Sequence, residues 1–222
     1  MLSSHLRMKN FMPGDPLTES EPGLVIRLPP PRLDSAVSVE SALARRRSVR
    51  EFDRRPLALA DMAQLLWAAQ GVTGPERERT APSAGALYPL EVFLVAGKGG
   101  EPPAGIYRYR AHGHDVALLS QGDQRARLAG AALAQDWLAA APVTIVVAAV
   151  FERTASRYRR RAERYVLMEV GHAAQNIHLQ AVALGLGTVV VGAFDDAEVK
   201  RVLGLAGHEQ PLCLMPVGQP RG

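Results

Sequence analysis

Cysteine is almost absent from this chain. The one cysteine among its 222 residues, Cys213, excludes an intrachain disulfide and any metal site built from several cysteines. Aromatic residues make up only 5% of the chain against 47% for all hydrophobic residues, so we expect a core of aliphatic side chains. No stretch approaches the ~18 uninterrupted apolar residues of a membrane span, and the N-terminus has no apolar run long enough for a signal peptide. These absences predict a cytoplasmic protein without a membrane segment.

The chain is basic, with a formal net charge of +4 and a pI of about 9.6. Such a balance is typical of nucleic-acid-binding proteins, of enzymes that hold phosphates, and of chains that simply carry many solvated arginines. No helix-turn-helix, zinc or RNA-recognition signature accompanies the charge. We therefore expect no nucleic-acid partner, although a basic nucleic-acid-binding protein stays an alternative that salt-dependent DNA binding would reveal.

The chain divides into an N-terminal arm at 1–35 and a single domain at 36–222. The arm has little periodicity, and an extended segment is expected there because it carries Pro13, Pro16, Pro22, Pro29, Pro30 and Pro31. The short run 23–28 could still pack as an edge segment of a sheet.

Hydrophobic periodicity predicts an irregular succession of helices and strands after the arm. Helices are expected from Ser38 through Leu43 and at 58–70, 123–139, 160–184 and 195–203, and strands at 91–96, 105–109, 115–119, 143–150, 188–192 and 211–217. The long irregular stretch 72–90 is of the kind that is usually functional or disordered. Because strands and helices do not alternate strictly, we predict an α+β fold with a mixed central sheet flanked by helices.

A dense cationic cluster, Arg45-Arg46-Arg47-Ser48-Val49-Arg50, follows the first predicted helix. Arginines that complement the helix dipole on a solvated face would explain it simply. Alternation along an extended segment, however, places Ser48 and Arg50 on one side, where fixed guanidinium donors and a hydroxyl would suit a phosphate and a polyol.

The small-residue segment 81–89, Ala-Pro-Ser-Ala-Gly-Ala-Leu-Tyr-Pro, leads directly into a predicted strand. Small side chains allow a backbone to approach a flat ligand closely. The segment 185–196 offers a similar opportunity, because a buried strand there ends at Gly192-Ala193 and an Asp-capped helix follows. Taken alone, each segment is equally compatible with an ordinary loop.

The predicted helix 160–184 is apolar on nearly all sides, apart from a stripe formed by Tyr165, Glu169, His172 and Asn176. A hydrogen-bonded structural seam is the simpler interpretation of such a stripe. Glu169 and His172 have no third ligand at suitable spacing, so we expect no metal site.

Together these segments resemble the nitroreductase family of FMN enzymes, and in detail its SagB-type dehydrogenase branch. The resemblance covers about 38–219 and rests on the ordered set of motifs at 46–50, 82–89, 151–154, 169–176 and 191–196. It implies a homodimer with two flavin sites between its subunits. That arrangement would give the apolar helix 160–184 a partner to pack against.

By resemblance, Arg46, Arg47, Ser48 and Arg50 would hold the FMN phosphate, ribityl chain and pyrimidine edge. Pro82, Ser83, Ala84 and Gly85 would lie near the flavin ring across the dimer interface, and Val191, Gly192 and Ala193 would offer backbone donors near its N5 edge. The implied activity is hydride transfer from NAD(P)H, through flavin N5, to a small acceptor such as a nitroaromatic or a quinone. Flavin chemistry needs no side-chain nucleophile, so no catalytic residue is assigned.

Two departures from the family pattern keep alternatives open. Relatives often return a basic residue to the flavin phosphate after the last strand, whereas here only Arg221 is placed to do so. Relatives that oxidise azolines in ribosomal peptides are associated with a Lys–Tyr pair, and Arg164-Tyr165 is the nearest equivalent. Azoline dehydrogenation of a peptide and a non-catalytic flavin- or peptide-binding module are therefore retained as alternative functions.

Overall fold

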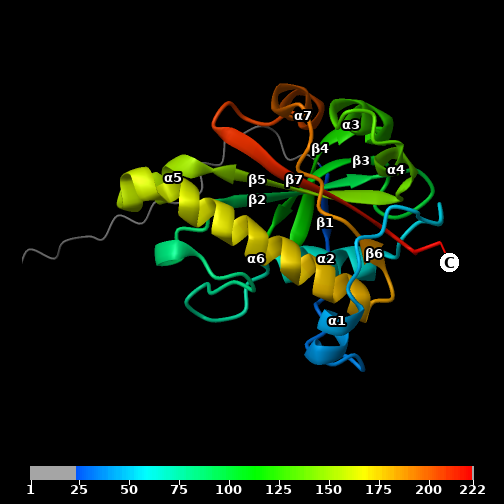
Figure 1. Ribbon diagram of the computed structural model, residues 1–222, viewed down its shortest axis with the longest axis horizontal. Coiled ribbons are helices and arrows are strands. Elements are labelled where there is room, and N and C mark those ends of the chain that lie inside the picture. The colour runs from blue at the N-terminus through cyan, green and yellow to red at the C-terminus, as the bar shows by residue number, and fades with distance from the viewer. Residues whose placement is uncertain (1–23, 222) are drawn as a thin grey trace, which may run out of the picture.

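A seven-stranded sheet forms the centre of the computed structural model, which describes residues 24–221 (Figure 1). Its strand order is β1-β4-β3-β2-β5-β7-β6. The strands are β1 (Val25–Arg27), β2 (Leu90–Ala96), β3 (Gly105–Arg110), β4 (Asp115–Gln121), β5 (Val143–Val150), β6 (Gly187–Thr188) and β7 (Glu209–Gly218). All the pairs between these strands are antiparallel, and one parallel bridge, between Ser48 and Thr188, makes the sheet mixed. The predicted α+β class is confirmed.

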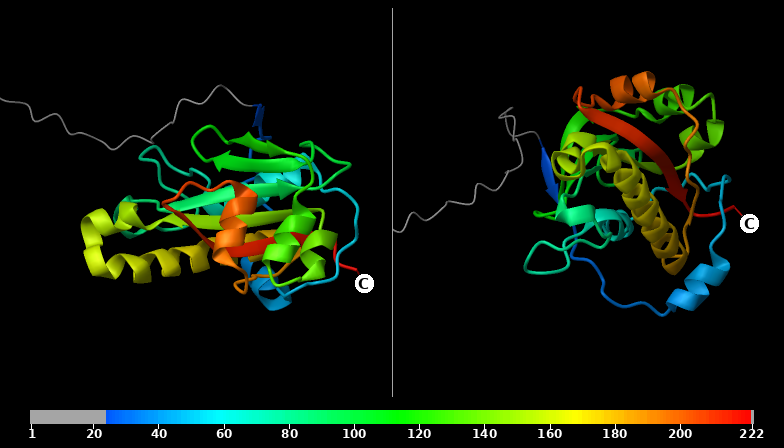
Figure 2. Two further views of the ribbon diagram at one scale, coloured as in Figure 1. Left: turned by 90° about the horizontal axis from the view of Figure 1, so that it is seen from above. Right: turned by 60° about the vertical axis from the view of Figure 1, so that its left-hand side comes forward.

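Strand β5 lies inside the sheet, between β2 and β7, and all eight of its residues are buried. Alternate side chains of a strand point to opposite faces, so β5 contributes to two hydrophobic cores. Ile145 and Val147 belong to the core beneath the helices α2 (Leu59–Gln70) and α6 (Ala162–Ala183). Val146 and Ala148 belong to the core beneath α3 (Arg125–Ala131), α4 (Asp136–Ala140) and α7 (Asp196–Leu203). Figure 2 shows these two helical layers on opposite faces of the sheet.

The remaining helices lie at the margins: α1 (Val39–Arg45), the short 3-10 turn η1 (Ala84–Ala86), α5 (Phe151–Tyr158) and η2 (Arg159–Arg161). Ser38 caps α1 by accepting a hydrogen bond from the Ser41 N–H, as its sequence position predicted. Strand β1 pairs with β4, so the described end of the arm does pack as a sheet edge. Residues 1–23 of the predicted arm lie outside the described residues. None of the described helices is both long and apolar enough to cross a membrane.

The predicted helix 123–139 is wrong, because the chain forms two short helices there, α3 and α4. Leu133 and Ala134 between them both have φ 56°, which a helix does not allow. The side chain of Gln135 bonds the carbonyl oxygens of Ala132 and Ala193, both at 2.9 Å. This tertiary contact stabilises a break that helix propensity alone does not indicate.

The predicted strand 188–192 is also too long, since β6 ends at Thr188. Thr188 pairs with Val217, and the next contact with β7 is the bridge between Val191 and Leu214. Pro216 lies between those two points and has no N–H to continue the ladder. The pairing with β7 is therefore interrupted at 189–190 and resumes only at the single bridge of Val191. Helix α5 was not predicted at all.

Candidate functional site

The segment 46–50 lies directly beside β6. The Val49 N–H donates to the Thr188 carbonyl oxygen at 3.0 Å, and Ser48 forms the parallel bridge with Thr188. A Cβ atom on Gly187 would come within 2.8 Å of three side-chain atoms of Val49. Glycine is therefore required at 187 for this close approach, which holds Ser48 and Arg50 on an exposed surface.

The arginines of this segment differ in how far they are already engaged. Arg47 bonds the carbonyl oxygens of Ala44 and Arg46, so its guanidinium complements the C-terminal end of α1. The Arg50 guanidinium lies 5.7 Å from the centre of the Trp137 ring on α4. Among residues 24–221 neither Arg46 nor Arg50 has a carboxylate within ion-pair distance. Both cations can accept an anionic ligand.

The positive charge of Arg46 affects the protonation of a buried histidine. His178 of α6 is buried, and burial first, then the positive charge of Arg46, lowers the pKa of this histidine to about 4. His178 is consequently neutral near pH 7. The positive charge at this end of the site therefore comes from the arginines alone.

The chain that follows β6 provides a second wall. Thr188 is buried, and its Oγ1 has no hydrogen-bond partner among the described residues. The Val191 N–H donates to the Leu214 carbonyl oxygen at 2.9 Å, so it is not free for a ligand. Gly192 and Ala193 are exposed, and within the described chain no acceptor takes either N–H. A Cβ atom on Gly192 would meet nothing within 4 Å, so the space in front of this turn is open.

The end of the described chain lies at the same place. The Asp53 N–H donates to the Gln219 carbonyl oxygen at 2.9 Å, and the Arg221 N–H donates to the Glu51 carbonyl oxygen at 3.0 Å. Arg221 therefore lies beside the residue that follows Arg50, and its side chain is exposed.

The structure does not bring the 82–85 loop to this surface within one subunit. Ser83 lies near Glu169 on α6, whereas Arg46 lies near His178, nine residues further along the same helix. Nine residues of α-helix span about 13 Å. The two predicted halves of the site therefore lie at separate positions along α6.

The 82–85 loop is nevertheless held by hydrogen bonds to the residues that follow it. The Ser83 hydroxyl oxygen accepts from the Tyr88 N–H at 2.9 Å, and Arg153 donates to the Tyr88 carbonyl oxygen at 3.1 Å. Ala86 and Tyr88 adopt positive φ angles of 54° and 46°, which cost free energy in non-glycine residues. Segments held in such a conformation are common at functional sites.

The polar stripe on α6 is only partly a buried seam. Glu169 is buried, Asn176 donates to the Thr80 carbonyl oxygen at 3.1 Å, and the Tyr165 ring packs edge-on against that of Tyr158. Within one subunit His172 is exposed, so it does not belong to the buried part of the stripe. The buried face of α6 is centred on Val166, Ala173 and Ile177. His172 lies just beyond its edge, since one residue rotates the side chain by about 100°.

The exposed face of α6 carries apolar side chains. Leu167 and Met168 are 49% and 53% exposed. On neighbouring α1, Val39 and Leu43 are also exposed. Large exposed aliphatic groups on adjacent elements are typical of a protein–protein contact.

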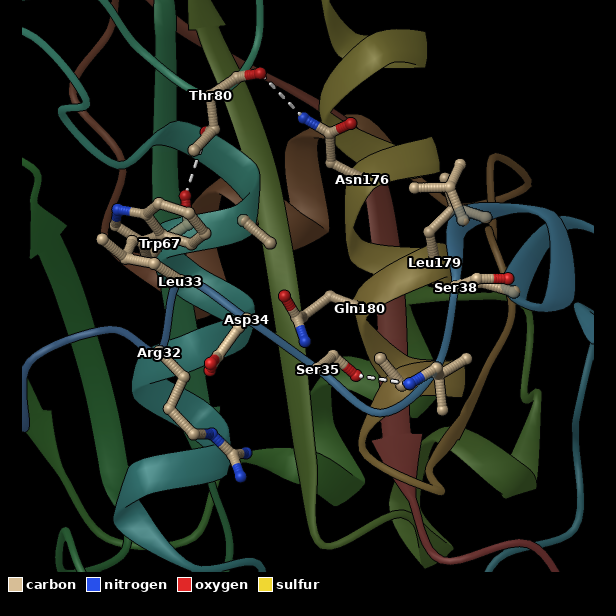
Figure 3. A pocket seen from close by; sticks show the side chains of 15 residues that line it. Arg32, Leu33, Asp34, Ser35, Ser38, Trp67, Thr80, Asn176, Leu179 and Gln180 are labelled. Atoms are coloured by element: carbon tan, nitrogen blue, oxygen red, sulfur yellow. Dashed lines mark hydrogen bonds between the residues drawn. The ribbon is translucent and has the colours of Figure 1, made fainter.

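A separate cavity of about 410 Å³ lies between the chain at 32–42, α2 and α6 (Figure 3). Trp67, Asn176 and Leu179 are among the side chains that line it. It contains none of the residues predicted to bind a cofactor. The described residues also contain no group of three or more His, Cys, Asp or Glu that could hold a metal ion.

Sequence reasoning missed several residues at the site. Thr188 could have been found, because a polar residue within an otherwise apolar strand is a visible signal. Trp137 and Gln135 give no such signal, because their position depends on the break between α3 and α4.

Comparison with known proteins agrees with this architecture. A family model described as the nitroreductase family matches residues 43–219. The protein MJ1384 of Methanocaldococcus jannaschii, named as a nitroreductase, is 44% identical over 183 residues, which cover 82% of this chain and 91% of that protein.

Solved structures give the same result. A Ralstonia eutropha protein named as a nitroreductase has a TM-score of 0.79 at 30% identity, covering 90% of this chain and 94% of that one. A chain of the Escherichia coli microcin synthetase McbBCD complex, solved with truncated pro-MccB17 bound, has a TM-score of 0.71 at 25% identity, covering 85% of this chain and 76% of that one. Because the family model spans most of the sequence and the fold agrees, this chain belongs to the nitroreductase family of oxidoreductases.

Proposed function

We propose that this protein is an FMN-dependent oxidoreductase that passes a hydride from NAD(P)H to a small organic acceptor such as a nitroaromatic or a quinone. The observation that carries the proposal is the junction between the segment 46–50 and β6. Two unpaired arginines, an exposed serine and two open backbone N–H groups meet there, although they come from distant parts of the chain. Nitroreductase-family proteins generally use a flavin, and this set of donors suits one.

The chemistry of the donor set fits FMN in particular. Arg46 and Arg50, with Arg221 beside them, supply cations for one phosphate group. The exposed Ser48 hydroxyl can bond a polyol chain. Gly192 and Ala193 present N–H donors in an open space that a flat ring can approach. The sequence contains no Gly-x-Gly-x-x-Gly fingerprint for a dinucleotide.

A second copy of the chain would complete the site. The 82–85 loop is too far along α6 to border the ring held by its own subunit, so it would border the ring held by the other. The exposed side chains of Leu167 and Met168 supply an apolar surface for that contact. The bound flavin would accept a hydride at N5 and pass it on. The protein's own residues bind and orient the cofactor, and none is needed as a nucleophile.

The released cofactor tests the proposal directly. The purified protein is expected to be yellow, to release FMN on denaturation, and to oxidise NADH or NADPH in the presence of a quinone. Release of FAD, or a colourless protein that gains no FMN on titration, would overturn the assignment. Bound FMN without any oxidation of NADH or NADPH would instead support a non-catalytic flavin-binding module.

Azoline dehydrogenation of a peptide is the second candidate function. Its support is the likeness to a chain of the microcin synthetase complex, which was solved with a truncated precursor peptide bound. In this protein Arg164 is exposed, and Tyr165 packs against Tyr158 with ring centres 4.9 Å apart. Incubation of the holoprotein with a thiazoline-containing peptide should give a mass loss of about two hydrogen atoms if this function is present. An unchanged peptide mass, together with turnover of a quinone, favours the first candidate.

A further inference from the structure

Glu169 is a buried acid in the middle of α6 that no ion pair explains. Its exposed fraction is only 2%, and its Oε1 has no hydrogen-bond partner among residues 24–221. Buried polar atoms almost always find a partner, so an orphaned carboxylate oxygen needs an explanation. No carboxylate–cation distance within 4 Å involves Glu169 among the described residues.

The groups that face Glu169 come from the chain at 79–88. Arg79 packs its guanidinium over the Tyr88 ring at 4.5 Å and donates to Gln70 Oε1 at 2.9 Å, while its Nε is buried without a partner. Beyond Arg79 lie Glu91 and Arg153, which pair with each other. His172, three residues further along α6, lies on the same stripe as Glu169 but is exposed.

Burial dominates the protonation of this acid. It raises the pKa of Glu169 to about 7, although the Ser83 hydroxyl and the charge of Arg79 act in the opposite direction. Glu169 therefore exchanges its proton near neutral pH. An acid with such a pKa is suited to proton transfer at the pH of most cells.

Ser83 links the buried acid with the surface. Its oxygen accepts from the Tyr88 N–H, which leaves the hydroxyl hydrogen free to point at the Glu169 carboxyl group. Ser83 is half-buried, and Pro82 and Gly85 on either side are exposed. A molecule lying on the 82–85 loop would thus be one hydroxyl group away from Glu169.

We propose that Glu169 stores a proton and delivers it, through the Ser83 hydroxyl, to an acceptor bound on the 82–85 loop. The inference rests on the proposed function, which places this loop beside the flavin of the other subunit. A reduced flavin, when bound, would supply the acceptor with a hydride and its two electrons, and the Ser83 hydroxyl would donate one proton to the acceptor. The Glu169 proton moves to the Ser83 oxygen, and the carboxylate regains a proton from solvent. The acceptor would thereby gain two hydrogens, and the flavin would be left oxidised.

A purely structural role accounts less well for these features. A glutamine at 169 would fill the same volume and would carry no charge into the core. Retaining a buried carboxyl group costs stability at neutral pH. Perturbed acids of this kind cluster at functional sites.

The test compares Glu169→Gln and Ser83→Ala with a matched control, Glu163→Gln, which changes an exposed glutamate of the same helix. Stopped-flow measurements on the holoprotein follow flavin reduction by NADH or NADPH and flavin reoxidation by a quinone separately. We expect both Glu169→Gln and Ser83→Ala to slow reoxidation at pH 6 by about a hundredfold. The rate of the unchanged protein should fall as pH rises through 7, and both variants should lose this fall. Flavin reduction and all rates of Glu163→Gln should stay unchanged.

A direct titration provides a readout that does not depend on turnover. In protein labelled with ¹³C at the glutamate side-chain carboxyl carbon, one resonance should titrate near pH 7, disappear in Glu169→Gln and persist in Ser83→Ala. An unchanged pH profile in Glu169→Gln, or a titration near the ordinary glutamate pKa, would overturn the proton-delivery proposal alone. Protein that binds no flavin would overturn the proposed function as well, and is recognised by its colour before any rate is measured.

Discussion

Replacing Glu169 with glutamine should change how the stability of this protein depends on pH. The folded state holds the Glu169 proton up to a pKa of about 7, whereas the unfolded chain releases it near the ordinary value of 4.5. Between these two values the folded state binds more protons than the unfolded state. The free energy of unfolding therefore decreases as pH rises through this window.

The size of the effect follows from the shift. A change from 4.5 to about 7, at 1.36 kcal/mol per pH unit, corresponds to about 3 kcal/mol for the whole window. Between pH 5.5 and 8.5 about 2 kcal/mol of this remains. Glutamine has no proton to lose, so Glu169→Gln should gain about 2 kcal/mol relative to the unchanged protein over that range. Other titrating groups are common to both proteins and cancel in the difference.

Urea unfolding at fixed protein and flavin concentrations measures this difference, because oligomer and ligand binding would otherwise shift the midpoints. Glu163→Gln should show no such trend, since Glu163 is exposed in the first turn of α6. If the stability difference between Glu169→Gln and the unchanged protein is constant from pH 5.5 to 8.5, Glu169 titrates normally. The burial argument would then be wrong.

Four further outcomes test other parts of the structure. Arg50→Ala should weaken FMN binding in fluorescence titrations by roughly ten- to a hundredfold, as expected for a lost charge-assisted contact, while the surface variant Arg201→Ala should not. Gly187→Ala should lower stability by about 1–3 kcal/mol in urea and reduce flavin occupancy, because its Cβ atom has no room. Met168→Glu should convert a dimer to a monomer in light scattering, and unchanged mass would place the dimer contact elsewhere. Burial raises the pKa of the Cys213 thiol to about 12, so thiol reagents should modify it only on unfolding; rapid reaction of native protein would contradict its burial.

The elements that sequence analysis predicted well are those whose burial is uniform. Strand β5 has the predicted bounds because all eight of its residues are buried and all except Thr144 are apolar. Helix α6 was predicted to within two residues at its start and one at its end, because a long apolar segment leaves few alternatives. Such patterns reflect burial within one element and need no knowledge of its neighbours.

The errors occur where a distant contact overrides the local pattern. The break between α3 and α4 depends on Gln135 reaching Ala193, fifty-eight residues away. The early end of β6 depends on Pro216 in another strand. In α6 the predicted polar stripe lies along the edge of the buried face, so that within one subunit Glu169 is buried and His172 is exposed. A single sequence carries no information on which edge of a polar stripe faces the core.

The candidate site was likewise only partly predictable from the sequence. Its cationic segment is visible in the sequence, yet its partner wall is not, because the pairing of Ser48 with Thr188 joins residues 140 positions apart. The one local trace of that pairing is Gly187, whose missing side chain makes room for Val49. From the sequence alone, this glycine indicates only the end of the preceding helix. Its second role becomes apparent only when the two segments are placed together, and this close approach leaves the Ser48 and Arg50 side chains facing outward. The geometry that suits a phosphate thus depends on an absent side chain as much as on the arginines.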